Sequence, residues 1–153
     1  MIIEIFNKQE KERIARKILA DLPEWFGLPE STENYIKESQ ELPFLASMDE
    51  GEAVGFAALQ QTGPRCADIF VMGVLKSNHR RGVGRALHAA LEALARARGY
   101  LYLQVKTVQM GHYPEYDRSN RFYQAMGFAE LECFPTLWDE WNPCQIYVKY
   151  IGG

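Results

Sequence analysis

The sequence predicts a single domain of mixed α/β class, in which helices pack against a central sheet. Apolar and alternating strand patterns are interspersed along the chain with amphipathic helical patterns, of which residues 84–98 are the clearest. No linker, repeat or low-complexity segment divides the 153 residues. A chain of this length folds as one domain and buries roughly two-thirds of its unfolded surface.

The first sixty residues predict one strand, two helices and a hairpin. Ile14, Ile18 and Leu22 recur at helical spacing, and Ser31 can cap a second, short helix. Residues 49–51, Asp-Glu-Gly, are typical of a hairpin turn. The expected elements are strand 2–6, helix 9–21, helix 31–39, strand 44–48 and strand 52–60.

The rest of the chain predicts a central strand followed by two further helices and three strands. Residues 67–74 are strongly apolar, as a central strand requires. Leu101, Leu103 and Val105 alternate with polar residues, and Gly99 can end the helix before them. The expected elements are strand 67–74, helix 84–98, strand 101–107, helix 119–127 capped by Ser119, strand 129–134, an aromatic loop at 135–143 and strand 145–151.

Composition argues against several classes of protein. The net charge of −3 disfavours broad, non-specific binding to nucleic acid. Cys66, Cys133 and Cys144 are far apart and lack metal-ligand spacing, so we expect reduced thiols, no metal site and a cytoplasmic protein. We expect no signal peptide and no membrane span, because no segment approaches the ~20 apolar residues that a span requires.

Residues 74–87 combine two features that bind anions. A basic loop containing Arg80 and Arg81 follows an apolar strand, and Gly82 and Gly84 then open a helix. A helix N-terminus presents unpaired N–H groups, and glycine lets an anion approach them closely. The stretch lacks the Gly-Lys-Ser/Thr of a phosphate-binding loop and the third glycine of a dinucleotide fingerprint. These residues alone leave open a site for a phosphate-bearing ligand and a solvated turn.

Two stretches together resemble the GNAT superfamily of N-acetyltransferases. The run His79-Arg80-Arg81-Gly82-Val83-Gly84 is similar to the acetyl-CoA pyrophosphate loop of that family, Q/R-x-x-G-x-G/A. Residues 120–128 resemble its later helix, with a Phe-Tyr pair and a terminal Gly-Phe. The resemblance covers residues 66–134 and is weak over residues 1–60. His79 departs from the motif, although a histidine can also donate a hydrogen bond to phosphate.

The resemblance implies a mixed, mostly antiparallel sheet of six to seven strands flanked by four helices. Strand 67–74 would splay from strand 101–107 and leave a cleft for the pantetheine arm of acetyl-CoA. The implied activity is direct transfer of an acetyl group from acetyl-CoA to a primary amine of a small molecule in a ternary complex, without a metal. A non-catalytic acyl-CoA-binding sensor is the alternative, and Tyr123 at the family's general-acid position counts against it.

The resemblance also implies where acetyl-CoA binds. Backbone N–H groups of the glycine loop would hold the pyrophosphate, and an N–H near Val74 would stabilise the oxyanion. Asn120 matches a position that often contacts the CoA arm, and its other reading is a first-turn residue beside the Ser119 cap. The implied cofactor-binding residues are Val74, Leu75, His79, Arg80, Arg81, Gly82, Val83, Gly84, Arg85, Asn120 and Tyr123.

Acetyl transfer also needs a proton donor and a base. Tyr123 matches the family's general acid, and a tyrosine with a pKa of about 10 stays protonated at neutral pH; otherwise it is a core partner of Phe122. Asp68 is the first candidate base, since a carboxylate on an apolar strand requires a partner or a role, unless it marks an exposed strand start. His112 is the second candidate, because its intrinsic pKa suits base catalysis.

Two tryptophan-bearing segments are candidate walls of the acceptor site. Trp25 and Phe26 lie in an early connection, and Trp138 and Trp141 lie near acidic residues in the predicted aromatic loop. Aromatic faces and carboxylates suit a cationic amine, although the same side chains could anchor these loops to the core. We expect a small-molecule amine as partner, rather than nucleic acid or a membrane. The strand at 145–151 could be an edge that pairs in a homodimer.

Overall fold

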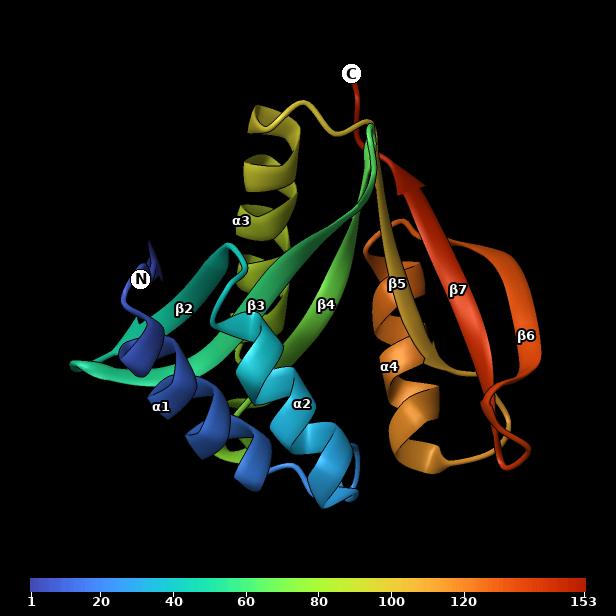
Figure 1. Ribbon diagram of the computed structural model, residues 1–153, viewed down its shortest axis with the longest axis horizontal. Helices are drawn as coiled ribbons and strands as arrows, with labels where there is room; N and C mark the ends of the chain where they lie inside the picture. The colour runs from blue at the N-terminus through green and yellow to red at the C-terminus, as the bar shows by residue number, and fades with distance from the viewer.

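Seven strands form one mixed, mostly antiparallel sheet in the computed structural model, which describes residues 1–153 (Figure 1). The strand order is β1-β2-β3-β4-β5-β7-β6, so β4 is central, as predicted, and only β4 and β5 pair in parallel. The strands are β1 Ile2–Glu4, β2 Phe44–Asp49, β3 Glu52–Gly63, β4 Cys66–Val74, β5 Tyr102–Val108, β6 Ala129–Asp139 and β7 Asn142–Tyr150. The helices are α1 Lys8–Ala20, α2 Pro29–Ser39, α3 Val83–Ala97 and α4 Pro114–Ala125.

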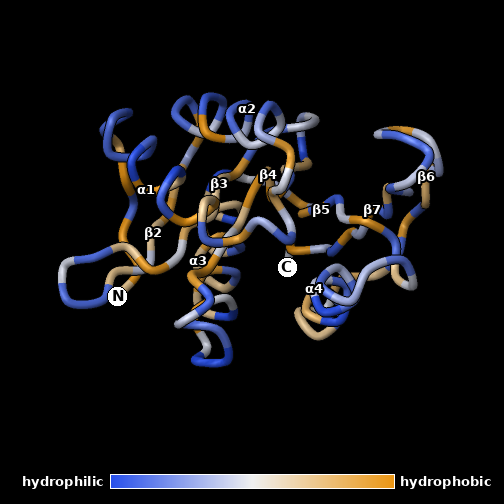
Figure 2. Tube along the Cα trace, turned by 90° about the horizontal axis from the view of Figure 1, so that it is seen from below, coloured by the Kyte–Doolittle hydropathy of each residue, from blue (hydrophilic) through white to orange (hydrophobic).

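Helices cover both faces of the sheet. Figure 2 shows α1 and α2 on one face and α3 and α4 on the other. Two apolar cores result, one beneath α1 and α2 and one beneath α3 and α4. The first contains Ile14, Ile18, Phe44, Phe56 and Val71. The second contains Leu87, Leu91, Leu103, Val105 and Phe128. None of the four helices is long and apolar enough to cross a bilayer.

The central strands β4 and β5 separate after a short paired segment, as predicted. Residues 66–68 of β4 pair with residues 102–104 of β5, and no pairing follows (Figure 1). Phe70 lies at a register shift, because Ala58 pairs with Val71 while Leu59 pairs with Ile69. A bulge of this kind bends a strand and increases its twist. Beyond the last paired residues, no strand pairing joins the facing edges of β4 and β5.

Gly55 of β3, which pairs with Val74 at the end of β4, lets the start of α3 pack closely against the sheet. A Cβ on Gly55 of β3 would lie 2.9 Å from Cδ1 of Leu87 and 3.1 Å from Cγ1 of Val83. Contacts this short require a residue without a side chain. The helix is confirmed close to its expected bounds, and Gly99, with φ of 87°, ends it as predicted. This packing brings the N-terminus of α3 to the end of β4, where β4 and β5 are no longer paired.

Two helices begin earlier than predicted. The structure starts α2 at Pro29 rather than Ser31, and α4 at Pro114 rather than Ser119. Neither helix has a side-chain N-cap. Proline suits the first helical position, because its φ is already helical and its missing N–H is not needed there. The two prolines mark where these helices begin, and the predicted starts at Ser31 and Ser119 were wrong.

The predicted loop at 135–143 is wrong, because β6 continues to Asp139 and β7 begins at Asn142. The Asp139 carboxylate closes the turn by accepting the N–H groups of Trp141 and Asn142 at 2.8 and 2.9 Å. The expected edge at 145–151 is also wrong. Strand β7 lies between β5 and β6, so the sheet edges are β1 and β6.

Candidate active site

The loop before α3, residues 79–85 (the α3 loop), presents a row of unpaired backbone donors. No group in the protein accepts the N–H groups of residues 80–85, and the first hydrogen bond of the helix runs from Ala86 N to Gly82 O. Gly82 and Arg80 have φ values of 78° and 62°, which turn the chain sharply before the helix. Arg81 and Arg85 are exposed beside them. Free donors, a helix N-terminus and these arginines suit the pyrophosphate of CoA.

His79 contacts the end of β4 and the α1–α2 connection through its ring. Its Nε2 donates to the carbonyl of Val74 at 2.8 Å, and its ring packs edge-on to Trp25. The hydrogen bond to phosphate predicted for this ring would have to come from Nδ1, because Nε2 is already engaged. His79 therefore fastens the α3 loop back onto the end of β4.

The last residue of β4 directs a free N–H into the space between the splayed strands. The N–H of Leu75 donates to Val54 O at 2.9 Å, so it faces β3 and is not available to a ligand. Consecutive N–H groups of a strand point to opposite edges. The N–H of Val74 therefore points away from β3 and toward β5, where an oxyanion donor would be needed.

Asp68 lies at the last paired position of β4, where the strands begin to separate. The residue is only 5% exposed, so it is not the exposed strand start considered as an alternative. Its Oδ2 lies 3.5 Å from Nζ of Lys106 on β5, while Oδ1 has no hydrogen-bond partner. Burial raises the pKa of Asp68 to about 6, and the Lys106 charge opposes that rise. A buried carboxylate with a free oxygen at this point can accept a proton near neutral pH.

Tyr123 is held by aromatic rings while its hydroxyl remains unbonded. The ring packs against those of Phe122, Phe128 and Tyr147, with centroids 5.5, 5.8 and 6.2 Å away. No group in the protein forms a hydrogen bond with its hydroxyl. Burial, followed by the charge of Asp68, raises the pKa of Tyr123 above its usual value. The hydroxyl therefore carries its proton at neutral pH, as a general acid requires.

Asn120 directs its side chain into hydrogen bonds within the protein. The side chain is fully buried, and Nδ2 donates to Val108 O at 2.8 Å and to Tyr116 O at 2.7 Å. The hydroxyl of Tyr147 donates to Oδ1 at 2.6 Å. With both amide hydrogens engaged, Asn120 has no donor left for the CoA arm. Because α4 begins five residues earlier than predicted, it is not a first-turn residue either.

Trp25 connects the α1–α2 loop to α4 and so joins the two sides of the splay. Its Nε1 donates to Glu115 O at 3.2 Å and to Ser119 Oγ at 3.1 Å. The hydroxyl of Tyr116 donates to Trp25 O at 2.8 Å, and the Arg118 guanidinium lies 5.8 Å above the indole ring. These contacts support the anchoring role considered for Trp25. Phe26 packs edge-on to Tyr35 at 5.7 Å.

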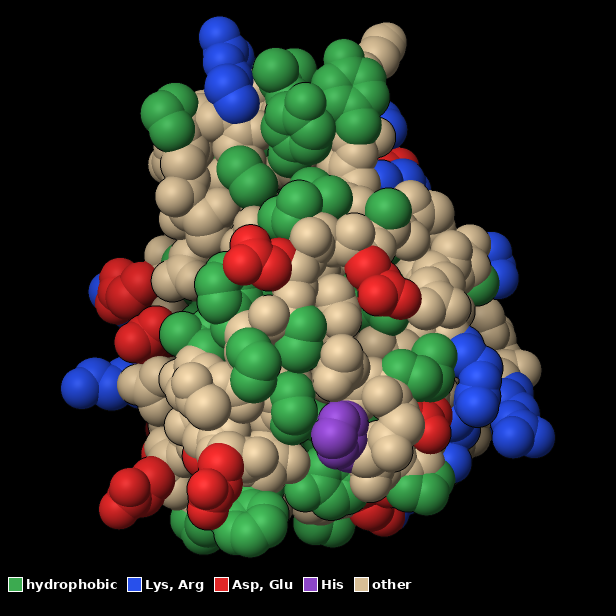
Figure 3. Space-filling model, turned by 90° about the vertical axis from the view of Figure 1, so that its right-hand side faces the viewer, with side chains coloured by type: hydrophobic (Ala, Val, Ile, Leu, Met, Phe, Trp, Pro, Cys, Tyr) green, Lys and Arg blue, Asp and Glu red, His purple; other side chains and the backbone are tan.

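The other predicted site residues lie farther along the fold. Trp138 and Trp141 are 43% and 70% exposed on the β6–β7 hairpin, where the hydroxyl of Tyr113 donates to Trp141 O at 3.3 Å. Figure 3 views the molecule from this side and shows many exposed hydrophobic side chains. His112 is exposed between β5 and α4, with one contact of 3.4 Å to Gln109. No hydrogen bond, ion pair or ring contact joins His112 to Asp68.

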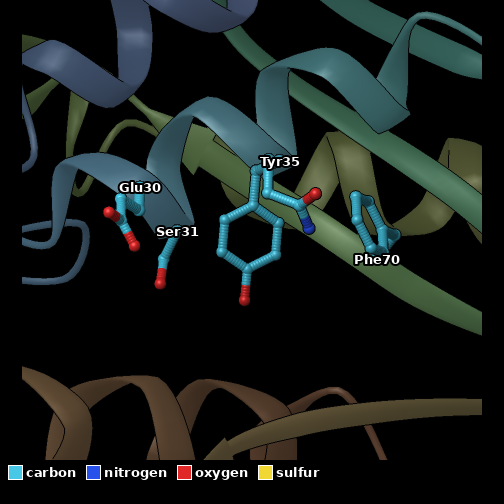
Figure 4. A pocket seen from close by; sticks show the side chains of 5 residues that line it. Glu30, Ser31, Tyr35 and Phe70 are labelled. Atoms are coloured by element: carbon cyan, nitrogen blue, oxygen red, sulfur yellow. The ribbon is translucent and has the colours of Figure 1, made fainter.

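A cavity of about 410 Å³ lies in front of α2, and we call it the α2 pocket. In Figure 4, Glu30, Ser31 and Tyr35 point from α2 into the space that separates it from α4. Burial raises the pKa of Tyr35, and the charge of Asp68 adds to the rise. The residues that line the pocket are Glu30, Ser31, Asn34, Tyr35 and Phe70.

Sequence reasoning missed Lys106, Tyr35 and Tyr116 as residues of the candidate site. Lys106 was predicted on a strand, and its alternation with Val105 places it opposite the core beneath α3 and α4. Burial is the main cause of the raised pKa of Tyr123, and after Asp68 the residues Tyr35 on α2 and Tyr116 on α4 add to it. Only the lysine had a usable signal, since a charge beside a buried strand requires a partner. No group of three or more His, Cys, Asp or Glu residues is arranged to hold a metal.

Comparison with solved structures shows the same fold in several other proteins. A GNAT-family structure from Desulfovibrio desulfuricans superposes with a TM-score of 0.86 at 18% identity, over 99% of each chain. An aminoglycoside 6'-N-acetyltransferase from Enterococcus faecium gives 0.78 at 21%, over 100% of this chain and 98% of that one. The ribosomal-protein-S18-alanine N-acetyltransferase from Escherichia coli gives 0.77 at 19%, over 100% and 96%.

Sequence comparison identifies the family itself. No curated protein matches the chain in sequence. The model of the acetyltransferase (GNAT) family matches residues 11–128, which include β4, the α3 loop and α4. The chain therefore belongs to the GNAT family of acetyltransferases and uses acetyl-CoA as its co-substrate.

Proposed function

We propose that the protein transfers the acetyl group of acetyl-CoA to a primary amine of a small molecule, by direct attack in a ternary complex. The observation that carries this proposal is the unpartnered oxygen of Asp68. A buried carboxylate oxygen without a hydrogen bond is unfavourable unless a ligand completes it. A protonated or attacking amine is such a ligand, because it offers N–H donors.

Each proposed step has a residue suited to it. Acetyl-CoA supplies the acetyl group as an activated thioester. Asp68 takes a proton from the acceptor nitrogen as the new N–C bond forms, and the N–H of Val74 stabilises the oxyanion. Tyr123 donates its proton to the sulfur as the C–S bond breaks. The products are an amide and a thiol, and no residue of the protein is acetylated.

The α2 pocket supports a small acceptor. Its volume of about 410 Å³ is within the range of small-molecule sites. Its lining contains no cationic side chain. Structural relatives include an enzyme named for aminoglycosides and another named for a ribosomal protein, so the fold alone does not select the acceptor.

The test is thiol release from acetyl-CoA in the presence of a panel of primary amines. We expect release with at least one amine, and substitution Tyr123→Phe should lower kcat by about 10²-fold while CoA affinity, measured by calorimetry, stays nearly unchanged. Tyr150→Phe removes an exposed hydroxyl at the end of β7 and serves as the control. Tight CoA binding without release for any amine would instead favour an acyl-CoA sensor. Unchanged turnover in Tyr123→Phe at every pH would remove Tyr123 from the mechanism.

A further inference from the structure

The α1–α2 loop, residues 21–28, is fastened to the segment that follows β4. The Asp21 carboxylate accepts the N–H of Lys76 at 2.8 Å, and the Lys76 ammonium group forms an ion pair with Glu24. Two polar contacts to one residue fix where the loop lies relative to the end of β4. Trp25, the next residue, therefore leaves this anchor from a defined position.

The side chain of Trp25 contacts both halves of the splayed sheet. Its ring packs edge-on to His79, with centroids 6.2 Å apart, and His79 in turn holds the carbonyl of Val74 on β4. Its Nε1 donates to Ser119 Oγ at 3.1 Å and to Glu115 O at 3.2 Å, both on α4. Figure 1 shows the α1–α2 loop and the first turns of α4 at the same, lower end of the molecule.

The backbone of Trp25 is bound to α4 as well. Its carbonyl accepts the hydroxyl of Tyr116 at 2.8 Å. Every hydrogen bond between α4 and the part of the chain that precedes β5 involves Trp25. Because hydrogen bonds depend on both distance and direction, contacts to the ring and to the carbonyl together fix Trp25 relative to α4.

Strand pairing does not fix this spacing. The pairing of β4 with β5 ends at Asp68 and Gln104, and Val74 lies six residues farther on, about 20 Å along a strand. On the other face of the sheet, α4 contacts α3 through Phe122, whose ring centroid is 6.5 Å from that of His88. Apolar contact of this kind is not directional. The hydrogen bonds of Trp25 are therefore the directional contacts that hold α4 across the open part of the splay.

The groups assigned to the reaction lie on the two sides that Trp25 joins. The N–H of Val74 belongs to β4, and the hydroxyl of Tyr123 belongs to α4. Tyr123 follows Ser119 by four residues, so the two lie on the same face of the helix. Both groups must reach one thioester, and a misplacement of about 1 Å can lower the rate on the order of 10²-fold.

We propose that Trp25 is a positioning residue, which holds Tyr123 at the distance from Val74 that acetyl transfer requires. This inference rests on the proposed function and adds to it the residue that sets the geometry of the two groups. Trp25 does not touch the reacting atoms. It acts through its hydrogen bonds to Ser119 and Glu115, on the helix that carries Tyr123.

The test is a double-mutant cycle in thiol release, with an amine that the wild-type protein acetylates. Trp25→Phe should lower kcat about tenfold and change the KM for acetyl-CoA less than twofold, because the α3 loop is intact. In the Tyr123→Phe protein the same substitution should lower kcat less than twofold, since no hydroxyl remains to be positioned. A tryptophan that only stabilised the fold would lower kcat by the same factor in both backgrounds.

Ser119 tests the same contacts with a smaller change. Ser119→Ala removes one acceptor of the indole N–H and should lower kcat about threefold, whereas Ser119→Thr keeps the hydroxyl and should restore it. Thr62→Ala is the matched control, because it removes a hydroxyl that donates to Cys66 O at 3.3 Å and does not reach α4. Amide hydrogen exchange, followed by mass spectrometry, should be faster at residues 114–120 of Trp25→Phe and unchanged in α3.

The outcomes separate this inference from the proposed function. Unchanged kcat in Trp25→Phe, or an equal loss with and without the Tyr123 hydroxyl, would overturn the inference and leave acetyl transfer intact. The absence of thiol release with every amine would overturn both. A loss confined to proteins that retain the Tyr123 hydroxyl, together with rescue by Ser119→Thr, would establish Trp25 as a positioning residue.

Discussion

The α3 loop and the α2 pocket lie at the same splayed pair of strands but are built in different ways. The α3 loop consists of adjacent residues, and its binding groups are backbone N–H donors. The proposed acceptor side takes Tyr35 from α2, Asp68 from β4, Lys106 from β5 and Tyr123 from α4. Backbone donors suit a co-substrate that is the same throughout a family. Side chains from separate elements can vary independently, so they suit an acceptor that differs between members.

The largest effect is expected at Asp68, where a substitution should lower kcat without changing CoA affinity. Replacement of Asp68 by Asn should lower kcat about 10³-fold, because an amide cannot accept the proton, while CoA affinity remains near wild type. Steady-state kinetics and CoA calorimetry measure the two quantities. Glu130→Gln removes an exposed acid on β6 and should change neither. Full activity of Asp68→Asn would assign the base to another group or to water.

The same replacement should stabilise the fold. The pKa of Asp68 is raised from 3.8 to about 6, so the native state binds this proton more tightly than the unfolded chain does. The contribution of Asp68 to stability therefore falls as pH rises from about 4 to about 6, and the full penalty remains above that range. We expect Asp68→Asn to increase the free energy of unfolding at pH 7 by about 3 kcal/mol. Urea unfolding at pH 7 and pH 4 would show a gain confined to the higher pH.

A change at Gly82 should weaken CoA binding and leave the acceptor side unaffected. Its φ of 78° disfavours any residue with a Cβ, although nothing lies within 4 Å of that Cβ. Gly82→Ala should weaken CoA binding about tenfold by displacing the donors of the α3 loop, with the acceptor KM unchanged at saturating acetyl-CoA. Gly51→Ala is a matched control, because Gly51 also has positive φ and open surroundings, in the β2–β3 turn. Equal loss of CoA binding in both variants would contradict the role of the loop.

The smallest effect concerns Lys106, whose charge lowers the pKa of Asp68. Activity should rise with pH through about 6 as Asp68 loses its proton. Lys106→Met removes the charge that lowers the pKa of Asp68, so this rise should move to higher pH by about one unit. The pH profile of kcat/KM for the acceptor measures the shift, and Lys37→Met, an exposed change on α2, controls for net charge. A profile that stays in place would show that Asp68 does not set it.

The sequence predicted the elements that depend on local pattern. The apolar run of β4, the period of α3 and the end of α3 at Gly99 each follow from neighbouring residues, and all were confirmed. The errors occurred where the pattern was weak. The aromatic residues of 135–143 suggested a loop. Instead, β6 continues to Asp139, and the Asp139 carboxylate closes the tight turn that leads into β7. Serine caps were preferred at two helices that proline begins.

By itself, the sequence determined the family, the co-substrate and the loop before α3, because these depend on residues that are contiguous in the chain. Tertiary structure alone decided that Asn120 turns into the core, that His79 fastens the loop to Val74, and that Lys106 meets Asp68. Each of these outcomes is a contact between distant segments. Burial and pairing, which set the state of Asp68 and the shape of the α2 pocket, arise only when those segments pack together.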